Sequence, residues 1–204
     1  LFQQSIMDGL LSVTYDGATF SFPLDEVSDV NIETKVWDDI AMTQVVSHLA
    51  GEWFSEQLGQ TAKLVKISNE NARLHHSSAT DTSYPVSLAD GYPYLIIGEE
   101  SLKLLNEKMS EKVPMNRFRP NIVVSTSIAH EEDAWRDFKI GSASFTNIKP
   151  CGRCNVITIE QSTGKINNET LKILNTYRKK GNSVLFGTNV ICHISGKVSI
   201  GDTV

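Results

Sequence analysis

Asn116-Arg117-Phe118-Arg119-Pro120-Asn121-Ile122-Val123-Val124 leads from a polar, arginine-containing segment directly into an apolar strand. The run 121–125 has the composition of a buried strand, and Pro120 stiffens the chain where it enters that strand. Arg119 has a planar fork of donors that holds an anion through parallel hydrogen bonds, and Asn121 offers a donor and an acceptor to a heterocycle edge. The alternative is a surface arginine pair with an asparagine at the start of a strand.

Short strands and a few helices are predicted on both sides of this stretch. Residues 9–23 have the pattern of a hairpin that turns at Asp16-Gly17, and residues 31–37 alternate like a half-buried strand. Apolar residues recur at helical spacing in 43–58, in a helix capped by Ser101, and in 169–178. Further strands are predicted at 61–67, 94–97, 137–140, 144–148, 155–159, 183–186, 189–193 and 196–200, and a polar loop at 69–84. Many short strands with few helices between them predict an α+β fold with a β-rich, barrel-like core.

The composition of the chain restricts its function. Its 204 residues carry a net charge of −5, and 40% of them are hydrophobic, which is enough for a core. A surface that binds nucleic acid needs concentrated positive charge, so no nucleic-acid partner is expected. No apolar run reaches the ~20 residues of a membrane helix, and the cysteines are too few for a disulfide framework. We therefore expect a reducing, cytoplasmic compartment and no membrane segment in this chain.

The cysteine pair in Lys149-Pro150-Cys151-Gly152-Arg153-Cys154 is a candidate site. Two thiols at this spacing suit zinc, thiol exchange or a soft transition metal. A four-cysteine zinc site needs a second such pair, which the sequence lacks. The alternative is an ordinary turn before a strand, in which the cysteines serve as small residues.

Three other segments carry weaker indications. In the turn Asp90-Gly91-Tyr92-Pro93, the carboxylate is placed to accept hydrogen bonds from backbone or ligand donors, although a plain turn has the same sequence. In Phe186-Gly187-Thr188-Asn189, the glycine permits close backbone approach and Asn189 is polar between apolar strands, while a β-bulge is the alternative. The run Glu131-Glu132-Asp133-Ala134-Trp135 is predicted to be a solvated acidic loop anchored by its tryptophan.

Taken together, these segments resemble the MOSC family, named after the C-terminal domain of molybdenum cofactor sulfurase. Within the family they resemble the branch of the mitochondrial amidoxime-reducing components and their bacterial relatives. The resemblance covers residues 90–204 well and the first half loosely, through Trp37 and the segment 54–59. The resembling segments are, in chain order, 116–124, 132–135, 140–141, 149–154, 163–164, 186–189 and 198–202.

The resemblance implies that the chain binds a molybdenum cofactor (molybdopterin). In the family a protein cysteine ligates the metal, and this makes Cys154 the expected catalytic and metal-ligating residue, with Cys151 the second choice. The expected cofactor contacts are Asp90, Gly91, Tyr92, Arg119, Asn121, Arg153 and Asn189. A thiolate suits a soft molybdenum centre, while arginine and asparagine suit the phosphate and the pterin edge of the cofactor.

The resemblance also implies an activity, the two-electron reduction of small N-hydroxylated substrates such as amidoximes. The electrons are expected from a separate iron–sulfur, flavin or haem protein, since the sequence has no cysteine cluster for an iron–sulfur centre. The cofactor would perform the redox chemistry, and the protein would hold it and shape the entrance.

The family fold joins a β-rich MOSC core to an N-terminal MOSC-associated β-domain. We therefore expect residues 68–204 to form the MOSC domain and residues 1–67 to be a remnant of the β-domain. Relatives begin with a further stretch, which includes a Tyr-Pro-Ile-Lys-Ser-like segment and an arginine that help to hold the cofactor. We accordingly expect that the chain begins partway into a longer protein.

Two other functions remain open. A carrier or sulfuration module would bind the cofactor with the same residues and hand it on without turnover. An attached pyridoxal-phosphate-dependent domain, and with it pyridoxal phosphate binding, would favour this alternative, and no such domain is visible in the sequence. A cofactor-free interaction domain is the other alternative, and it predicts that Cys154→Ser changes nothing beyond local packing.

Overall fold

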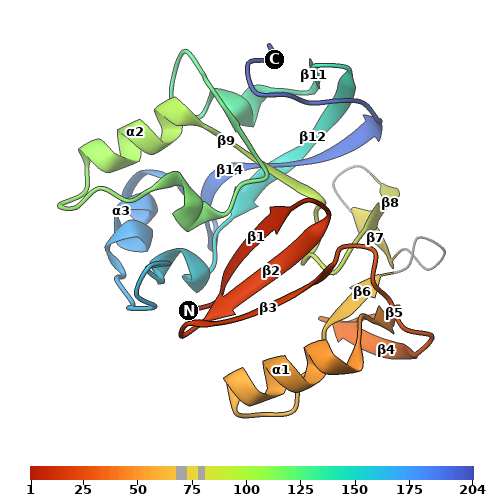
Figure 1. Cartoon of the computed structure of the whole chain (residues 1–204). Coiled ribbons are helices and arrows are strands. Elements are labelled where there is room, and N and C mark those ends of the chain that lie inside the picture. The colour runs from red at the N-terminus through yellow and green to blue at the C-terminus, as the bar shows by residue number, and fades with distance from the viewer. Residues whose placement is uncertain (68–72, 78–80) are drawn as a thin grey trace. The chain divides into compact units, whose positions relative to one another are not determined.

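The computed structural model describes residues 1–67, 73–77 and 81–204, and the chain folds as two units. Unit 1 consists of Leu1–Leu74 and Pro85–Asp90, and unit 2 of His75–Tyr84 and Gly91–Val204. Figure 1 traces the chain through both by colour. The predicted domain boundary between residues 67 and 68 adjoins the segment 68–72, which lies outside the described residues, and it stays a prediction.

Unit 1 contains two small antiparallel sheets and one helix. The first sheet has the order β1 (Gln3–Met7), β2 (Leu10–Tyr15), β3 (Ala18–Pro23), and the second has the order β4 (Asn31–Val36), β5 (Asp39–Val45), β6 (Val65–Ile67). The hairpin predicted at 9–23 is confirmed as β2 and β3, with Asp16 and Gly17 at positive φ in the turn. The strand predicted at 31–37 is confirmed as β4.

Helix α1 (His48–Leu58) is shorter than predicted at its start. The predicted helix began at residue 43, but Thr43 and Val45 pair with β6 as part of β5. Ser47 ends the extended segment and caps the helix, because its hydroxyl accepts a hydrogen bond from Ala50 N. Gly59 closes the helix in the left-handed conformation, as its sequence position indicates.

The polar segment 69–84 was predicted to be a loop, and this was wrong in its described part. Strands β7 (Arg73–Ser77) and β8 (Thr82–Val86) form a two-stranded sheet, while residues 68–72 and 78–80 lie outside the described residues. The buried positions of β7 are occupied by Arg73 and Ser77. A pattern of apolar residues could not reveal this strand, because its inward side chains are polar.

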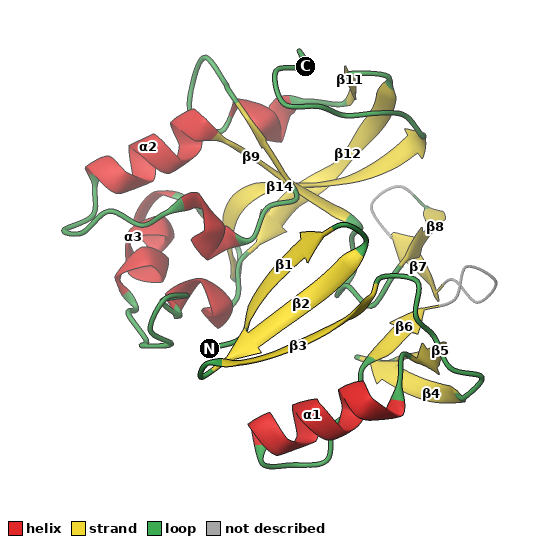
Figure 2. Cartoon of the chain, viewed as in Figure 1, coloured by secondary structure: helices red, strands yellow, loops and turns green. Residues whose placement is uncertain are grey.

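Unit 2 is built on a six-stranded sheet that curls into a half-barrel, and the predicted α+β class with a β-rich core is confirmed (Figure 2). The strands are β9 (Tyr94–Gly98), β10 (Ile122–Val124), β11 (Asp137–Ile140), β12 (Ala143–Gly152), β13 (Lys179–Lys180) and β14 (Ser183–Ile194). The sheet order is β10-β9-β14-β12-β11, with β13 paired to β14. Strands β9 and β10 are parallel, and α2 (Glu99–Glu107) lies in the connection between them.

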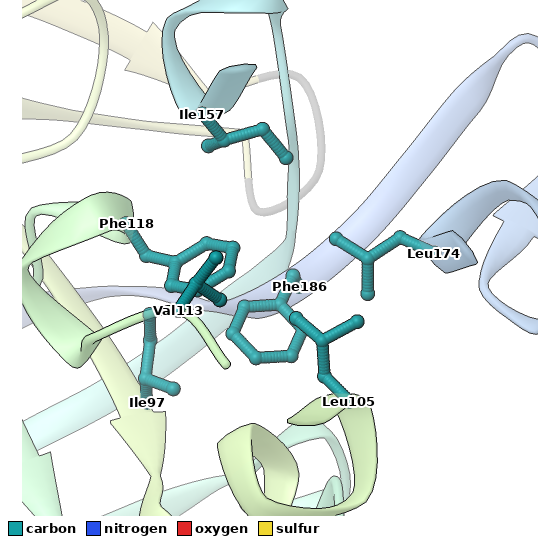
Figure 3. Close-up of a cluster of buried hydrophobic side chains, with 7 residues drawn as sticks. All are labelled: Ile97, Leu105, Val113, Phe118, Ile157, Leu174 and Phe186. Carbon is teal, nitrogen blue, oxygen red and sulfur yellow. The ribbon is translucent and has the colours of Figure 1, made fainter. Parts of the chain in front are cut away.

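The sheet of unit 2 has a hydrophobic core on each face. Adjacent residues of β9 show this, because Ile97 belongs to one cluster and Ile96 to the other. The first cluster joins the sheet to α2, α3 (Glu169–Tyr177) and the 3-10 turns η2 (Met115–Phe118) and η4 (Asn155–Thr158). Figure 3 shows its seven buried side chains, with Phe118 and Phe186 facing each other at a ring-centroid distance of 4.3 Å.

Gly187 explains why two predicted strands form one. The sequence predicted separate strands at 183–186 and 189–193, but β14 continues through both. Gly187 has φ +73°, and a Cβ at this position would lie 2.6 Å from Ile97 Cγ1, so only glycine fits there. The register between β12 and β14 shifts beside it, which confirms both the close backbone approach and the bulge proposed from the sequence.

The acidic run 131–135 is not a solvated loop, because Glu132 in η3 (Glu131–Ala134) is fully buried. Its carboxylate accepts hydrogen bonds from Gly98 N at 3.1 Å and from Ser101 Oγ at 2.8 Å. Ser101 therefore lies inside α2 rather than at its cap, which is Gly98. The donors come from residues far away in the sequence, and local composition could not indicate them.

Two further predicted strands are corrected. Residues 155–159 form η4 and its end rather than a strand, and Ile157 and Thr158 are buried there. The segment 196–200 forms no strand. Its backbone bonds to Ser142 through Lys197 and to the following turn through Ser199, without a strand ladder among the described residues. The turn predicted at Gly201-Asp202 is confirmed, with Ser199 N donating to Asp202 Oδ2 at 2.7 Å.

Candidate functional site

Neighbouring strands of unit 2 align two of the residues predicted to contact the cofactor, Asn121 and Asn189. Asn189 on β14 lies opposite Leu95 on β9 and opposite Lys149 on β12. Asn121 extends the pairing of β10 with β9, because Asn121 N donates to Leu95 O at 2.9 Å and Leu95 N donates to Asn121 Oδ1 at 2.8 Å. Asn121, Asn189 and Lys149 therefore lie at one level across the sheet, and no hydrogen bond from the Nδ2 donor of Asn121 is made to any described residue.

Arg153 joins the cysteine turn to the segment that carries Arg119. Its Nη1 lies 3.2 Å from Cys151 Sγ, and its Nη2 donates to Phe118 O at 2.8 Å. The guanidinium also lies 5.9 Å from the centroid of the Phe118 ring. These contacts hold the end of β12 against η2, and they occupy the arginine with protein groups rather than leave it exposed for a ligand.

Arg119 differs from Arg153 in having its side chain exposed. It follows η2 in the left-handed conformation, with φ 55° and ψ 47°, and its backbone N donates to Asn116 O. No hydrogen bond or ion pair engages its guanidinium within the part of the chain that the structure describes. The tight turn directs the chain into Pro120 and β10, and it leaves a free, charged donor fork one residue after Phe118.

The two cysteines of the turn are also unlike each other. Cys151 is half-buried at the end of β12 and accepts from Arg153, whereas Cys154 is exposed at the start of η4. Both thiols are free, as is Cys192. Among residues 1–67, 73–77 and 81–204, no three His, Cys, Asp or Glu side chains are grouped to hold a metal ion. A metal at Cys154 would therefore need further ligands from outside these side chains.

The predicted turn Asp90-Gly91-Tyr92 is divided between the two units. Asp90 belongs to unit 1, where Trp37 Nε1 donates to its Oδ1 at 3.1 Å. Arg73, which pairs with Asp39 at 2.9 Å, donates through Nη2 to the carbonyls of Ala89 and Asp90. Arg73 was not recognisable from the sequence, because it lies in the segment predicted to be a loop.

Gly91 and Tyr92 belong to unit 2 and lie in an aromatic group. The ring of Tyr92 is 5.5 Å from His75 and 5.8 Å from Tyr84, measured between centroids. Burial raises the pKa of Tyr84, which keeps its hydroxyl protonated. Lys149 Nζ lies 5.1 Å from the centroid of the Tyr92 ring and so connects this turn to the row of polar residues on the sheet. Sequence analysis quoted Lys149 next to the cysteines but gave it no role.

The structure thus connects five of the predicted residues. Arg153 bonds to Phe118 O, which places the neighbours Arg119 and Cys154 in adjoining segments, and Asn121 and Asn189 both pair with Leu95. Lys149 joins Tyr92 to them. The five residues are Arg119, Asn121, Arg153, Cys154 and Asn189. Gly91 lies beside Tyr92 in the chain, and Asp90 has its contacts in unit 1. No helix in the described segments is long and apolar enough to cross a membrane.

Comparison with known proteins identifies the family. A family model described as "MOSC domain" matches residues 83–204. The chain is 32% identical to the molybdenum cofactor sulfurase of Oryza sativa subsp. japonica over 181 residues, which cover 80% of this chain and 22% of that protein. It is 36% identical to mitochondrial amidoxime reducing component 2 of Bos taurus over 168 residues, 76% of this chain and 50% of that protein.

A relative from Homo sapiens, mitochondrial amidoxime-reducing component 1, is 27% identical over 219 residues, 96% of this chain and 65% of that protein. The chain thus spans between 22% and 65% of the length of these three relatives. The family match extends over more than half of the chain, and two of these relatives are 32% and 36% identical over most of it. The chain therefore belongs to the MOSC domain family.

Proposed function

We propose that this chain is the cofactor-binding part of a molybdenum-dependent oxidoreductase that reduces small N-hydroxylated substrates. The observation that carries the proposal is the cluster in unit 2, in which the exposed Cys154 follows a turn held by Arg153 to the segment of Arg119. Relatives named as amidoxime reducing components support the substrate class. As a working boundary, we assign residues 68–204 to the MOSC domain.

The donor groups of the cluster fit a molybdenum cofactor. An exposed thiol without a hydrogen-bond partner among the described residues suits a soft metal, and the unengaged guanidinium of Arg119 suits a phosphate. Asn121 keeps its Nδ2 donor for a heterocycle edge while Leu95 N holds its Oδ1. No basic surface is needed, since the ligand is small and its charge local.

Each residue of the cluster then has a distinct part in binding. Cys154 ligates the metal, Arg119 binds the phosphate through parallel hydrogen bonds, and Asn121 and Asn189 orient the pterin edge. Arg153 positions the cysteine turn and does not need to touch the cofactor, because Cys151 and Phe118 occupy both of its terminal nitrogens. Asp90, Gly91 and Tyr92 complete the proposed contacts.

When bound, the molybdenum would supply the two-electron chemistry of the reaction. Reduction of an N–OH group to N–H takes up two electrons and two protons and releases water. The described residues include no cysteine cluster that would hold an iron–sulfur centre, so we propose a separate iron–sulfur, flavin or haem protein as the electron donor. Free cysteines also support our proposal of a reducing, cytoplasmic compartment.

A test begins with molybdenum analysis of protein purified from a host that makes the cofactor. Molybdenum is expected near one atom per chain in the parent protein and in Cys192→Ser, and to be lost in Cys154→Ser. Cys151→Ser should keep most of it. Amidoxime reduction with a reduced viologen dye is then measured. Molybdenum retained by Cys154→Ser would overturn the assignment of Cys154 as the metal ligand. Absence of molybdenum from the parent protein and from all folded variants would overturn the proposal that the chain binds this cofactor.

A carrier or sulfuration module is the second candidate, and the similarity to a molybdenum cofactor sulfurase favours it. This function uses the same binding residues but requires release of the cofactor. Stoichiometric molybdenum without amidoxime reduction, together with transfer of the cofactor to an apoenzyme, would support the carrier over the reductase.

A further inference from the structure

A polar cavity of about 610 Å³ in unit 2 has no part in the proposed function. None of the residues proposed to hold the molybdenum cofactor lines it. Four of its lining side chains are cationic, namely Lys112, Arg117, Lys165 and Lys172. The three lysines are exposed, whereas Arg117 is buried with only 6% of its surface accessible. The cavity is therefore lined by one buried arginine and three exposed lysines.

Arg117 is unusual because it is buried without a partner. Its Nε and Nη1 are inaccessible and have no hydrogen bond to any described residue. Its backbone N donates to Pro114 O, which fixes the turn but does not compensate the guanidinium. An unpaired buried charge is costly in a protein interior, and it is normally balanced by a counter-ion or a hydrogen-bonded group. A ligand with several acceptor oxygens would compensate the charge of this arginine from the cavity that it lines.

The start of α3 lies beside the same cavity. Asn167, Asn168 and Glu169 line it, and α3 has nine residues. Asn168 provides no side-chain cap, and Glu169 N donates to Asn167 Oδ1 at 2.9 Å. The N–H groups of Thr170 and Leu171 have no acceptor in the described parts of the chain. Unsatisfied N–H groups and the helix dipole together favour an anion at such an end.

Three carboxylates also line the cavity, but two of them are engaged elsewhere. Glu169 accepts from Ser110 N and Ser110 Oγ, both at 2.8 Å, and these hydrogen bonds hold the pKa of its carboxyl below the usual value. Glu160 accepts from the hydroxyl of Thr163. Only Glu111 lacks such a partner among the described residues. None of the three pairs with Arg117, so the arginine keeps its binding capacity.

We propose that this cavity binds a phosphate-type oxyanion, either free phosphate or the phosphate group of a small metabolite. Arg117, which lines the cavity, donates to its oxygens, and the first N–H groups of α3 bind a further oxygen. Lys112, Lys165 and Lys172 add positive charge at the entrance. The volume leaves room beyond a phosphate, which allows an attached sugar or similar group.

The test is an NMR titration of the protein, as purified with whatever cofactor it carries, with inorganic phosphate. Signals of the Arg117 Nε–H and of the Thr170 and Leu171 amides are expected to shift and saturate. Each signal reports its own residue, so the result does not depend on molybdenum binding. Shifts confined to Arg119 and Asn121 would place the phosphate in the cofactor site and overturn the proposal, as would no shift at all.

Variants sharpen the assignment. Arg117→Met should abolish the titration, and the double variant of Lys165→Gln and Lys172→Gln, which leaves the interior unchanged, should weaken it about fivefold. Lys139→Gln, an exposed lysine on β11 outside the cavity, is the matched control and should have no effect. Tighter binding of glucose 6-phosphate than of phosphate would identify a metabolite, and equal binding the free ion. If the affinity for phosphate is unchanged in both the double variant and Arg117→Met, the proposal of a phosphate site in this cavity is wrong.

Discussion

Two of the three arginines next to Phe118, Arg153 and Arg117, have opposite environments. Arg153 lies over the ring of Phe118, and both terminal nitrogens have partners, Cys151 Sγ and Phe118 O, while its Nε has none among the described residues. Arg117, the residue before Phe118, is buried more deeply, yet two of its nitrogens have no partner among the described residues. A paired arginine stabilises and positions its neighbours, whereas an unpaired one retains the capacity to bind. Burial and pairing, rather than residue type, distinguish the two roles.

The largest effect is expected when Phe118, which both arginines adjoin, is removed. Phe118→Ala deletes a fully buried ring that packs on Phe186 and on the Arg153 guanidinium. The free energy of unfolding should fall by about 3–5 kcal/mol, because a large cavity is left. Urea denaturation measures this, with the exposed Ile128→Ala as a control that should change little. A loss below about 1 kcal/mol would mean that the core of unit 2 is packed differently.

Arg153→Met should have the second largest effect. The substitution keeps much of the side-chain volume but leaves Phe118 O and Cys151 Sγ without their donor. We expect a loss of about 2 kcal/mol in the free energy of unfolding, as is usual for hydrogen bonds from a charged group. The molybdenum content should also fall, since the cysteine turn is no longer held. Arg136→Met, at an exposed position, is the control, and equal stability of the two variants would contradict the positioning role.

Arg117→Met should act in the opposite direction. In phosphate-free buffer the free energy of unfolding should stay unchanged or rise by about 1 kcal/mol, because an apolar side chain replaces an unpaired buried charge. Phosphate at about ten times its Kd should raise the Tm of the parent protein by roughly 3 °C and leave that of the variant unchanged. If Arg117→Met destabilises as strongly as Arg153→Met without phosphate, the two arginines do not differ as described.

The smallest effect concerns His130, whose ring lies 5.9 Å from that of Phe186 in the same core. Burial, with the nearby charge of Arg178, lowers the pKa of His130 from 6.5 to about 4. The unfolded state therefore binds a proton before the folded state does, and stability is lost as the pH falls from 6.5 to about 4. Solvent screening should keep the loss below about 1 kcal/mol.

His130→Asn tests this shift, because asparagine accepts the left-handed backbone at this position and does not titrate in this range. Its free energy of unfolding should change less than that of the parent between pH 7 and pH 4.5. His48→Asn, at an exposed helix position, should follow the parent. Identical pH dependence in all three proteins would show that the His130 ring is accessible to water.

Local sequence patterns were sufficient to predict secondary structure where a segment buries apolar residues at a regular spacing. The hairpin at 9–23, strand β4 and helix α3 were predicted for this reason. Patterns failed where burial is polar or depends on distant partners, as for Arg73 in β7 and Glu132 in η3. For the site, the sequence predicted which residue types gather, but it did not predict that Arg153 is occupied or that Arg117 is unpaired. Both depend on tertiary contacts.

The position of β14 in the sheet has a consequence for synthesis of the protein. It lies between β9 and β12 in the six-stranded sheet, yet it is the last strand of unit 2 along the chain. On the ribosome, β9 and β10 emerge early and must wait for residues 183–194 before the centre of their sheet exists. Such distant pairing slows folding and exposes strand edges meanwhile. Unit 2 is therefore expected to need chaperone protection until residues 183–194 have emerged, whereas the hairpins of unit 1 can form as they emerge.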